Sequence, residues 1–282
     1  MKDYTKYKNL YLLCFTDDTP EDAELLFKNV LSKAKLVCEY DNAENPISML
    51  FLMDANIISN GKELPYYYLY AACTHPEHRG KGIMGRLLEK AKEVALNNGK
   101  LGIFLKPAKP SLFDFYAKSD FVPFFNVCKI IKSANEFIRL YSPQIANTTK
   151  TTMSLWHSIR KDFLNEFNCD YVDFSQDILT TAADGSIPMS NDTFGFVYEI
   201  RDNLLLVKEA LCKSGYINQL MSAISHILQD SHCENIEIRL HPLLKDELTS
   251  FSEINVPISV MWQPSETTNQ CNTNRYHGFA FD

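Results

Sequence analysis

The chain has 282 residues, of which 45% are hydrophobic and 12% aromatic, enough to bury one large core or two ordinary ones. This composition excludes disordered and fibrous proteins, and the net charge of −7 is unevenly distributed. Residues 1–140 carry a net charge of +2 and residues 141–282 a net charge of −9. The acidic second half argues against nucleic acid as a partner. It either keeps the surface soluble or attracts a cationic small molecule.

In the first half, helices are predicted at 5–15 and 20–34, and Thr19 is a candidate N-cap for the second. Strands are predicted at 35–41, 47–58 and 66–73, and a helix from Gly82 to Asn98 follows. A strand at 101–106, a short helix at 111–119 and a strand near 124–131 complete this half. The order strand, helix, strand predicts two parallel strands joined by a crossover helix.

A polar, unpatterned segment within 133–153 predicts a boundary between two domains, 1–140 and 141–282. Beyond it, helices are expected at 154–167 and 216–230, and strands at 194–200, 203–211 and 236–240. The second crossover, at 204–240, is nearly as long as the first, at 66–105. We infer a degenerate internal duplication.

We expect a cytoplasmic protein without a membrane partner. No run approaches 18 apolar residues, and the N-terminal MKDYTKYKNL lacks the apolar segment of a secretory signal. The eight cysteines are spread along the chain, several in apolar runs such as LYLLCF, which predicts reduced thiols rather than a disulfide framework.

The turn before the helix at 82–98 carries the clearest functional signal. It reads Arg79, Gly80, Lys81, Gly82, Ile83, Met84, Gly85. Glycines let successive backbone N–H groups point at one place, and the helix N-terminus adds its positive end. With two basic side chains, this stretch predicts an anion-binding cradle; a plain tight turn before a helix is the alternative.

Two other phosphate-binding patterns fit less well. A Walker loop requires a Gly-Lys-Ser/Thr sequence, which this stretch lacks. The dinucleotide pattern G-x-G-x-x-G is matched from Gly80, but the unit follows several strands, and Lys106 stands where an acidic residue should end the next strand. A dinucleotide-binding domain is therefore the weaker interpretation.

The stretch ACTHPEHRGKGIMGRLL, residues 72–88, resembles the GNAT N-acetyltransferase superfamily, whose motif Q/R-x-x-G-x-G/A grips the pyrophosphate of coenzyme A. Arg79, Gly82 and Met84 occupy the motif positions, so methionine replaces the last small residue. A second segment, YAKSDF at 116–121, resembles the family's later tyrosine motif, with Asp120 in place of glycine. The two motifs together cover roughly residues 35–131.

The resemblance implies an α/β (α+β) fold, with a mixed, splayed GNAT sheet flanked by helices, followed by a degenerate GNAT-like domain. It also implies acetyl-CoA as cosubstrate, no metal, and direct transfer of an acetyl group to a primary amine. The implied coenzyme-binding residues are Ala72, Cys73, Thr74, Arg79, Gly80, Lys81, Gly82, Ile83, Met84 and Gly85. The backbone of 72–74 would hold the pantetheine arm and 79–85 the pyrophosphate.

Tyr116 is the implied catalytic residue, which would protonate the departing thiolate. Its unperturbed pKa of about 10 is similar to that of an alkyl thiol. A buried structural tyrosine is the alternative. The general base stays open among Asp54, Glu63, Tyr66, Tyr67, Tyr68, Tyr70 and the C-terminal carboxylate of Asp282.

Other candidates have ordinary explanations. Cys73, His75 and His78 share one short loop but supply no fourth metal ligand, and Cys73 lacks the base that an acyl-cysteine step needs. The scattered histidines at 226, 232 and 241 are expected to be surface or packing residues.

The second half contains one glycine and no arginine at its strand-to-helix turn, CKSGYINQ. We therefore expect it not to bind coenzyme but to complete the cleft for an amine acceptor, for which its charge would suit a polycation. A noncatalytic acyl-CoA-binding or regulatory module is the rival function. The sequence carries no signal for an oligomeric state.

Overall fold

A computed structural model of the chain describes residues 3–145, 147–167, 169–248, 254–264 and 275–277. The elements of the first half are α1 (Thr5–Cys14), α2 (Pro20–Asn29), β1 (Lys35–Tyr40), β2 (Pro46–Ser59), β3 (Lys62–Thr74), α3 (Ile83–Asn97), β4 (Ile103–Leu105), α4 (Leu112–Ala117) and β5 (Val122–Pro123). The predicted helices and strands of this half are all present. The helix predicted at 20–34 is shorter, because a 3-10 turn at Leu31–Lys33 follows α2.

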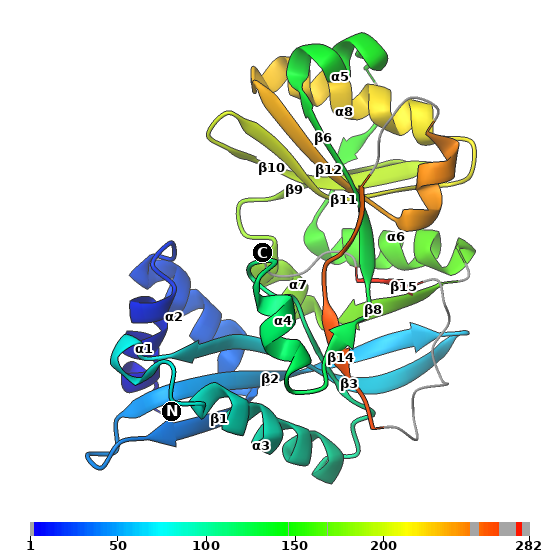
Figure 1. The fold of residues 1–282 in the computed structure, drawn as a ribbon. Helices are drawn as coiled ribbons and strands as arrows, with labels where there is room; N and C mark the ends of the chain where they lie inside the picture. The colour runs from blue at the N-terminus through cyan, green and yellow to red at the C-terminus, as the bar shows by residue number, and fades with distance from the viewer. Residues whose placement is uncertain (1–2, 146, 168, 249–253, 265–274, 278–282) are drawn as a thin grey trace.

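In the structure the second half is taken to begin at residue 126, with the strand β6. Its elements are β6 (Asn126–Ser133), α5 (Ala134–Leu140), β7 (Thr149–Lys150), α6 (Met153–Glu166), β8 (Asp170–Phe174), α7 (Gln176–Ala182), β9 (Ile187–Ser190), β10 (Phe194–Arg201), β11 (Leu204–Cys212), α8 (Ile217–Ser231), β12 (Asn235–Leu240), β13 (Ile254–Pro257), β14 (Val260–Trp262) and β15 (Arg275–Tyr276). Figure 1 shows two stacked parts, with β6 running from one into the other.

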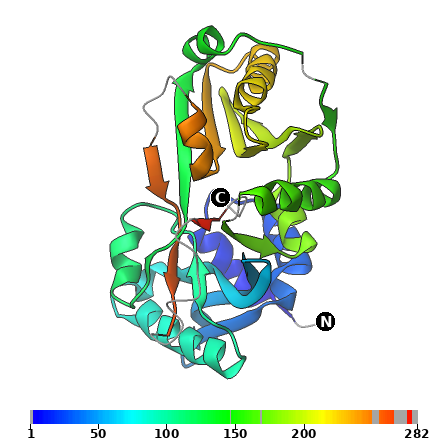
Figure 2. The same cartoon turned by 90° about the vertical axis from the view of Figure 1, so that its right-hand side faces the viewer.

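One mixed sheet runs through both parts, in the order β5-β14-β4-β3-β2-β8-β15-β6-β12-β11-β10-β9-β7. Both predicted crossovers are confirmed, since β3 pairs in parallel with β4 and β11 in parallel with β12. Helices cover the sheet, as Figure 2 shows from the side. The expected mixed α/β class is therefore confirmed.

The two halves exchange strands in a way that the sequence did not predict. β6 pairs antiparallel with β12, and α5 packs into the core around α8. The chain therefore enters the core around α8 before the boundary expected within 133–153, and α6 and β8 then return to the core of the first-half sheet. In the other direction, β14 pairs with β4 and β5 of the first half, and β8 pairs with β2. β8 and β14 are short, so they carry too few residues for a periodic hydrophobic pattern that would predict them.

Local sequence signals set the helices around the first-half sheet. Thr19 and Asp22 form a reciprocal capping box at the start of α2. Leu87, Leu88 and Ala91 of α3 are fully buried against one face of this sheet, while α1 and α2 pack on the other. The helix α3 ends at Asn98 and Gly99, as expected.

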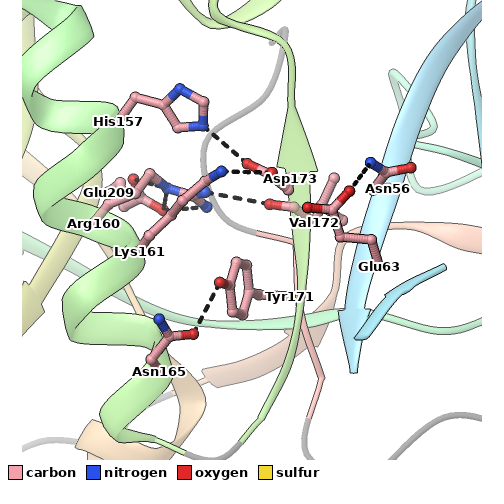
Figure 3. A network of polar contacts seen from close by, with 10 residues as sticks. All are labelled: Asn56, Glu63, His157, Arg160, Lys161, Asn165, Tyr171, Val172, Asp173 and Glu209. Atoms are coloured by element: carbon pink, nitrogen blue, oxygen red, sulfur yellow. Dashed lines mark hydrogen bonds and ion pairs between the residues drawn. The ribbon is translucent and has the colours of Figure 1, made fainter. Parts of the chain in front are cut away.

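A buried ion pair joins α6 to β11. The Nε atom of Arg160 lies 3.1 Å from Oε2 of Glu209, and the two side chains are 1% and 0% exposed. Trp156 Nε1 donates to the same carboxylate at 3.1 Å, and Arg160 also donates to the carbonyl oxygen of Val172 in β8 at 3.2 Å. Figure 3 shows this cluster beside the ion pairs of Asp173. These bonds satisfy the buried charges and fix α6 against two strands.

Candidate active site

The end of β3 is the starting point of the site. β3 pairs with β4 through Tyr67 and Tyr68, while β3 itself continues to Thr74. A bulge interrupts its pairing with β2 between Met49 and Phe51, and Ala71 there adopts a φ of +52°. A bulge bends a strand and redirects its side chains. In this described stretch β3 pairs with β4 only up to Tyr68, so Ala72, Cys73 and Thr74 have no partner in β4, as the splay implied by the resemblance requires.

The predicted cradle follows directly. Gly80 and Gly82 have φ values of +76° and +70°, in the left-handed region that L side chains rarely adopt. Gly82 is the N-cap of α3, so the free N–H groups of the first helical turn lie next to it. At Gly85 an added Cβ would meet no atom within 4 Å. The glycines therefore shape the turn and keep its open side clear.

The basic residues of the turn differ in position. Arg79 Nε donates to the carbonyl oxygen of Thr74 at 3.0 Å. Lys81 Nζ instead donates to the carbonyl oxygen of Glu77 at 3.0 Å, and Lys81 does not line the cavity described next. The structure thus separates Lys81 from the other residues that the resemblance implied.

A cavity of about 420 Å³, the cradle cavity, lies between α1, β3, α3 and α4. It is lined by Cys14, Phe15, Ala72, Cys73, Thr74, His78, Arg79, Gly80, Gly82, Ile83, Met84, Gly85, Leu112, Phe115 and Tyr116. All the expected coenzyme-binding residues except Lys81 are included, together with Tyr116. The sequence did not predict that α1, Leu112 and Phe115 contribute to this cavity. These residues belong to no motif and have the pattern of ordinary apolar helix faces.

Tyr116 lies in α4 and is 7% exposed. Its ring contacts those of Phe115 and Phe121, with centroids 5.2 and 5.9 Å away. Burial raises the pKa of Tyr116 to about 12. The expected match in acidity with an alkyl thiol therefore does not hold in the free protein, because the sequence could not show how far the phenol is removed from water.

Two of the acidic base candidates lie away from this cavity. Glu63 is near the start of β3, eleven positions before Thr74 and so roughly 35 Å along the strand. Figure 3 shows it pointing toward Asn56, whose Nδ2 donates to it at 3.2 Å. Asp54 is exposed and pairs with Lys100 at 2.5 Å. The candidate at Asp282 lies outside the described residues.

The four tyrosines of β3 point to different places. Tyr66 accepts a hydrogen bond from Gln263, and Tyr67 lies under Lys100, whose Nζ is 4.7 Å from its ring. Tyr68 packs in the core, 5.1 Å from the ring of Phe174. Tyr70 lines the second cavity, described next, whereas Tyr66, Tyr67 and Tyr68 line neither of the two cavities.

That second cavity, the aspartate cavity, has a volume of about 450 Å³ and lies between the two halves. It is lined by Tyr11, Asp18, Asp22, Leu25, Leu26, Asn29, Tyr70, Thr180, Thr181, Ala182, Asp184, Arg201 and Lys208. Tyr11 donates to the carboxylate of Asp18 and forms a hydrogen bond with Tyr70. The ring of Tyr11 stacks on that of Phe15 at 4.5 Å, so this ring pair forms a wall common to both cavities.

The corresponding turn of the second half is arranged differently. Before α8, the backbone N–H of Gly215 donates to the carboxylate of Glu247 at 3.0 Å. An acidic side chain of the protein itself thus occupies a donor that an anionic ligand would need.

The histidines of the second half lie apart from both cavities. His241 is fully buried, its ring stacks on Phe167 at 4.6 Å, and burial lowers its pKa to about 3. His226 lies 3.6 Å from Asp230, and His232 ends α8 with a φ of +56°. Across the described ranges, no three His, Cys, Asp or Glu side chains gather as metal ligands would. Within the same ranges, no helix has the length and apolar character needed to cross a bilayer.

Comparison with known proteins agrees with this geometry. A family model described as an acetyltransferase (GNAT) domain matches residues 1–123 and so ends just before β6. No curated protein matches the chain.

Solved structures share the fold over nearly the whole chain. A probable N-acyltransferase from Enterococcus faecalis is 12% identical with a TM-score of 0.73, over 92% of this chain and 70% of its own. A GCN5-related N-acetyltransferase from Anabaena variabilis is 14% identical with a TM-score of 0.69, over 93% and 70%. One from Kribbella flavida is 12% identical with a TM-score of 0.68, over 92% and 68%. These likenesses support the fold, and the family match supports an acyltransferase. The family match covers the N-terminal part of the chain, which carries the cradle cavity, so this part is similar to a GNAT acetyltransferase domain.

Proposed function

We propose that the protein transfers an acetyl group from acetyl-CoA directly to a primary amine. The observation that carries this proposal is the cradle cavity, where the diverging end of β3, the glycine turn before α3 and Tyr116 meet. A diphosphate needs clustered N–H donors and positive charge, and the turn with Arg79 offers both. A narrow thiol-bearing arm needs an apolar channel, which Ile83, Leu112 and Phe115 supply.

Coenzyme binding involves distinct parts of this cavity. The first turn of α3 and the Arg79 guanidinium would hold the pyrophosphate. The backbone of residues 72–74, at the end of β3 that has left β4, would hold the pantetheine arm and polarise the thioester carbonyl. When bound, acetyl-CoA supplies the activated acetyl group.

Tyr116, which lines the cradle cavity, would return a proton to the leaving sulfur. Its raised pKa makes the phenol a weaker acid than in water. Burial likewise raises the pKa of a thiol. Donor and acceptor therefore shift in the same direction, and the proton transfer stays feasible.

The aspartate cavity supports an amine acceptor. Asp18 and Asp184 offer carboxylates from the two halves, and the Tyr11 hydroxyl orients the carboxylate of Asp18. The cationic Arg201 and Lys208 of the same lining both pair with Glu199, so the aspartates can attract an ammonium group. Because the cavity shares its Tyr11 and Phe15 wall with the cradle cavity, an amine held there lies close to the thioester end. The second half would thus complete the acceptor cleft, while Glu247 blocks a second coenzyme site.

Thiol release from acetyl-CoA tests this proposal. The full chain is assayed with amino acids, polyamines, aminoglycosides and lysine peptides, and the acetylated product is identified by mass spectrometry. Calorimetry with coenzyme A measures binding separately. We expect micromolar coenzyme binding and turnover with one class of amine. Binding without turnover for any amine would favour the noncatalytic module, and no binding at all would refute the coenzyme site.

A further inference from the structure

Two cysteine side chains meet in the wall of the cradle cavity. Cys14 is the last residue of α1, and Cys73 is the second-last residue of β3. Both line the cavity, and the Cys14 thiol donates to the carbonyl oxygen of Thr74, the residue that follows Cys73, at 3.5 Å. The two residues are far apart in the sequence and no spacing pattern links them. Only the packing of α1 against β3 brings the thiols together.

The surroundings of Cys14 favour its thiolate. The terminal guanidinium nitrogen of Arg79 lies 3.9 Å from the Sγ atom of Cys14 and can donate a hydrogen bond to it. The hydrogen bond from Cys73 and the contact with Arg79 together lower the pKa of Cys14 to about 7. A half-buried thiol beside a fixed positive charge is the setting in which cysteine becomes nucleophilic.

Cys73 has the opposite character. It is 7% exposed, and its hydrogen bond to Cys14 together with burial raises its pKa well above the ordinary value. Cys73 therefore keeps its proton and donates it toward Cys14. An attacking thiolate and a protonated partner within contact form the minimal unit of thiol–disulfide exchange.

The other cysteines in the described ranges lack this combination. Burial raises the pKa of Cys38 to about 11, and that of Cys169 and of Cys212 to about 12. Cys128 and Cys233 are buried in the core around α8. Reaction with a small disulfide should thus select Cys14 by both charge and access.

We propose that Cys14 is a thiol–disulfide exchange site resolved by Cys73, so that a low-molecular-weight disulfide entering the cradle cavity converts the pair into a Cys14–Cys73 disulfide. In the first step the Cys14 thiolate attacks one sulfur of the reagent. A mixed disulfide forms, the reagent's S–S bond breaks, and one reagent thiolate leaves. In the second step the Cys73 sulfur attacks Cys14 Sγ and passes its proton to the departing thiolate. The reagent is reduced to two thiols, and the pair is oxidised to one disulfide.

The test treats the reduced full chain with 2-hydroxyethyl disulfide and follows intact mass and proteolytic peptides. We expect the wild type to lose two hydrogen atoms and to yield a peptide linking Cys14 to Cys73. Cys73→Ser should stop at the mixed disulfide on Cys14. Cys14→Ser should react at least about 10-fold more slowly than the wild type, because the remaining thiols are largely protonated.

Cys38→Ser is the matched control, since Cys38 is also partly exposed but lies outside the cradle cavity. It should react like the wild type, and circular dichroism checks that every variant is folded. If a variant at Cys14 unfolds, Cys14→Ala replaces it. Reaction of a folded Cys14 variant at the wild-type rate would overturn the inference, as would a wild-type mixed disulfide that never resolves.

A protection experiment relates this dithiol to the proposed function. Only this experiment depends on the proposed function. Saturating desulfo-coenzyme A, which has no thiol to react with the reagent, should slow the modification of Cys14 at least about 10-fold, because the pantetheine arm would fill the same cavity. Unchanged modification of Cys14 in the presence of desulfo-coenzyme A would refute the coenzyme site while leaving the dithiol in place. The two proposals therefore fail separately.

Discussion

Arg79 is tied to the end of β3 by a hydrogen bond of 3.0 Å from its Nε atom to the carbonyl oxygen of Thr74. The bond uses one edge of the guanidinium and leaves the other side chain nitrogens at the cradle cavity, near Cys14. It thereby connects the strand that would hold the pantetheine arm with the turn that would hold the pyrophosphate. A guanidinium fixed in this way needs little reorganisation to meet an anion.

Replacing Arg79 should therefore weaken coenzyme binding. We expect Arg79→Ala to raise the dissociation constant of coenzyme A about 10- to 100-fold, the equivalent of one charged hydrogen bond. Lys81→Ala is the control, because its ammonium group points to Glu77 and not into the cavity, and it should change the constant less than about 3-fold. Calorimetry measures both, and equal effects would contradict the division of roles between them.

A substitution at Gly85 should lower coenzyme affinity without lowering the stability of the fold. A leucine there meets no atom of the protein within 4 Å of its Cβ and lies in the first turn of α3. We expect Gly85→Leu to leave stability unchanged or to raise it by up to about 1 kcal/mol, since glycine is a poor helix former. Coenzyme affinity should fall at least about 10-fold, because the side chain would enter the cradle cavity. Glu93→Leu, on an exposed position of α3, should leave affinity unchanged. Thermal unfolding and calorimetry distinguish the two effects.

Tyr116→Phe should lower turnover about 10- to 1000-fold, the usual range for a lost general acid, while coenzyme binding persists. Because burial raises the pKa of Tyr116 to about 12, the phenol stays protonated through the accessible range. Its ionisation removes activity only as the pH rises toward 12, so the ratio of wild-type to variant turnover should be constant between about pH 7 and pH 10. If the ratio of wild-type to variant turnover falls toward 1 between pH 7 and pH 10, Tyr116 ionises near pH 8 or 9. That outcome would contradict the raised pKa.

Asp18→Asn should raise the KM for the amine about 10-fold without changing coenzyme binding. The carboxylate faces the aspartate cavity and accepts a hydrogen bond from Tyr11. Loss of one charged contact corresponds to roughly 1.5 kcal/mol. Asp17→Asn is the matched control, because the neighbouring side chain is exposed and outside the cavity. Steady-state kinetics with the identified amine checks the pair, and similar KM values for both variants would remove the aspartate cavity from acceptor binding.

The buried pair of Arg160 and Glu209 makes a prediction about stability. Arg160→Met leaves the Glu209 carboxylate buried without its partner, so we expect a loss of about 3–5 kcal/mol in the free energy of unfolding. The double variant Arg160→Met/Glu209→Leu should lose less than the single one, since no charge stays buried. Lys33→Ala, which breaks the exposed pair with Asp177, should cost less than about 1 kcal/mol. Urea denaturation measures all three.

The sequence by itself determined much of the local structure. The capping box at Thr19, the apolar face of α3 and its stop at Asn98 and Gly99 depend on neighbouring residues, so they could be predicted. The glycine turn from Arg79 to Gly85 is equally local, because its conformation follows from the freedom of glycine and the start of a helix.

The tertiary structure decided what surrounds that turn. It brought Cys14 of α1 and the following Phe15 into the cradle cavity and placed Tyr70 and Asp18 in a second one, while Lys81 turned away. It also moved β14 from the chain's far end into the first-half sheet. These contacts join residues distant in the chain, whose meeting depends on the packing of whole elements. No spacing along the sequence encodes such contacts. The chemical role of each side chain therefore depends on how the sheet and its helices pack around it.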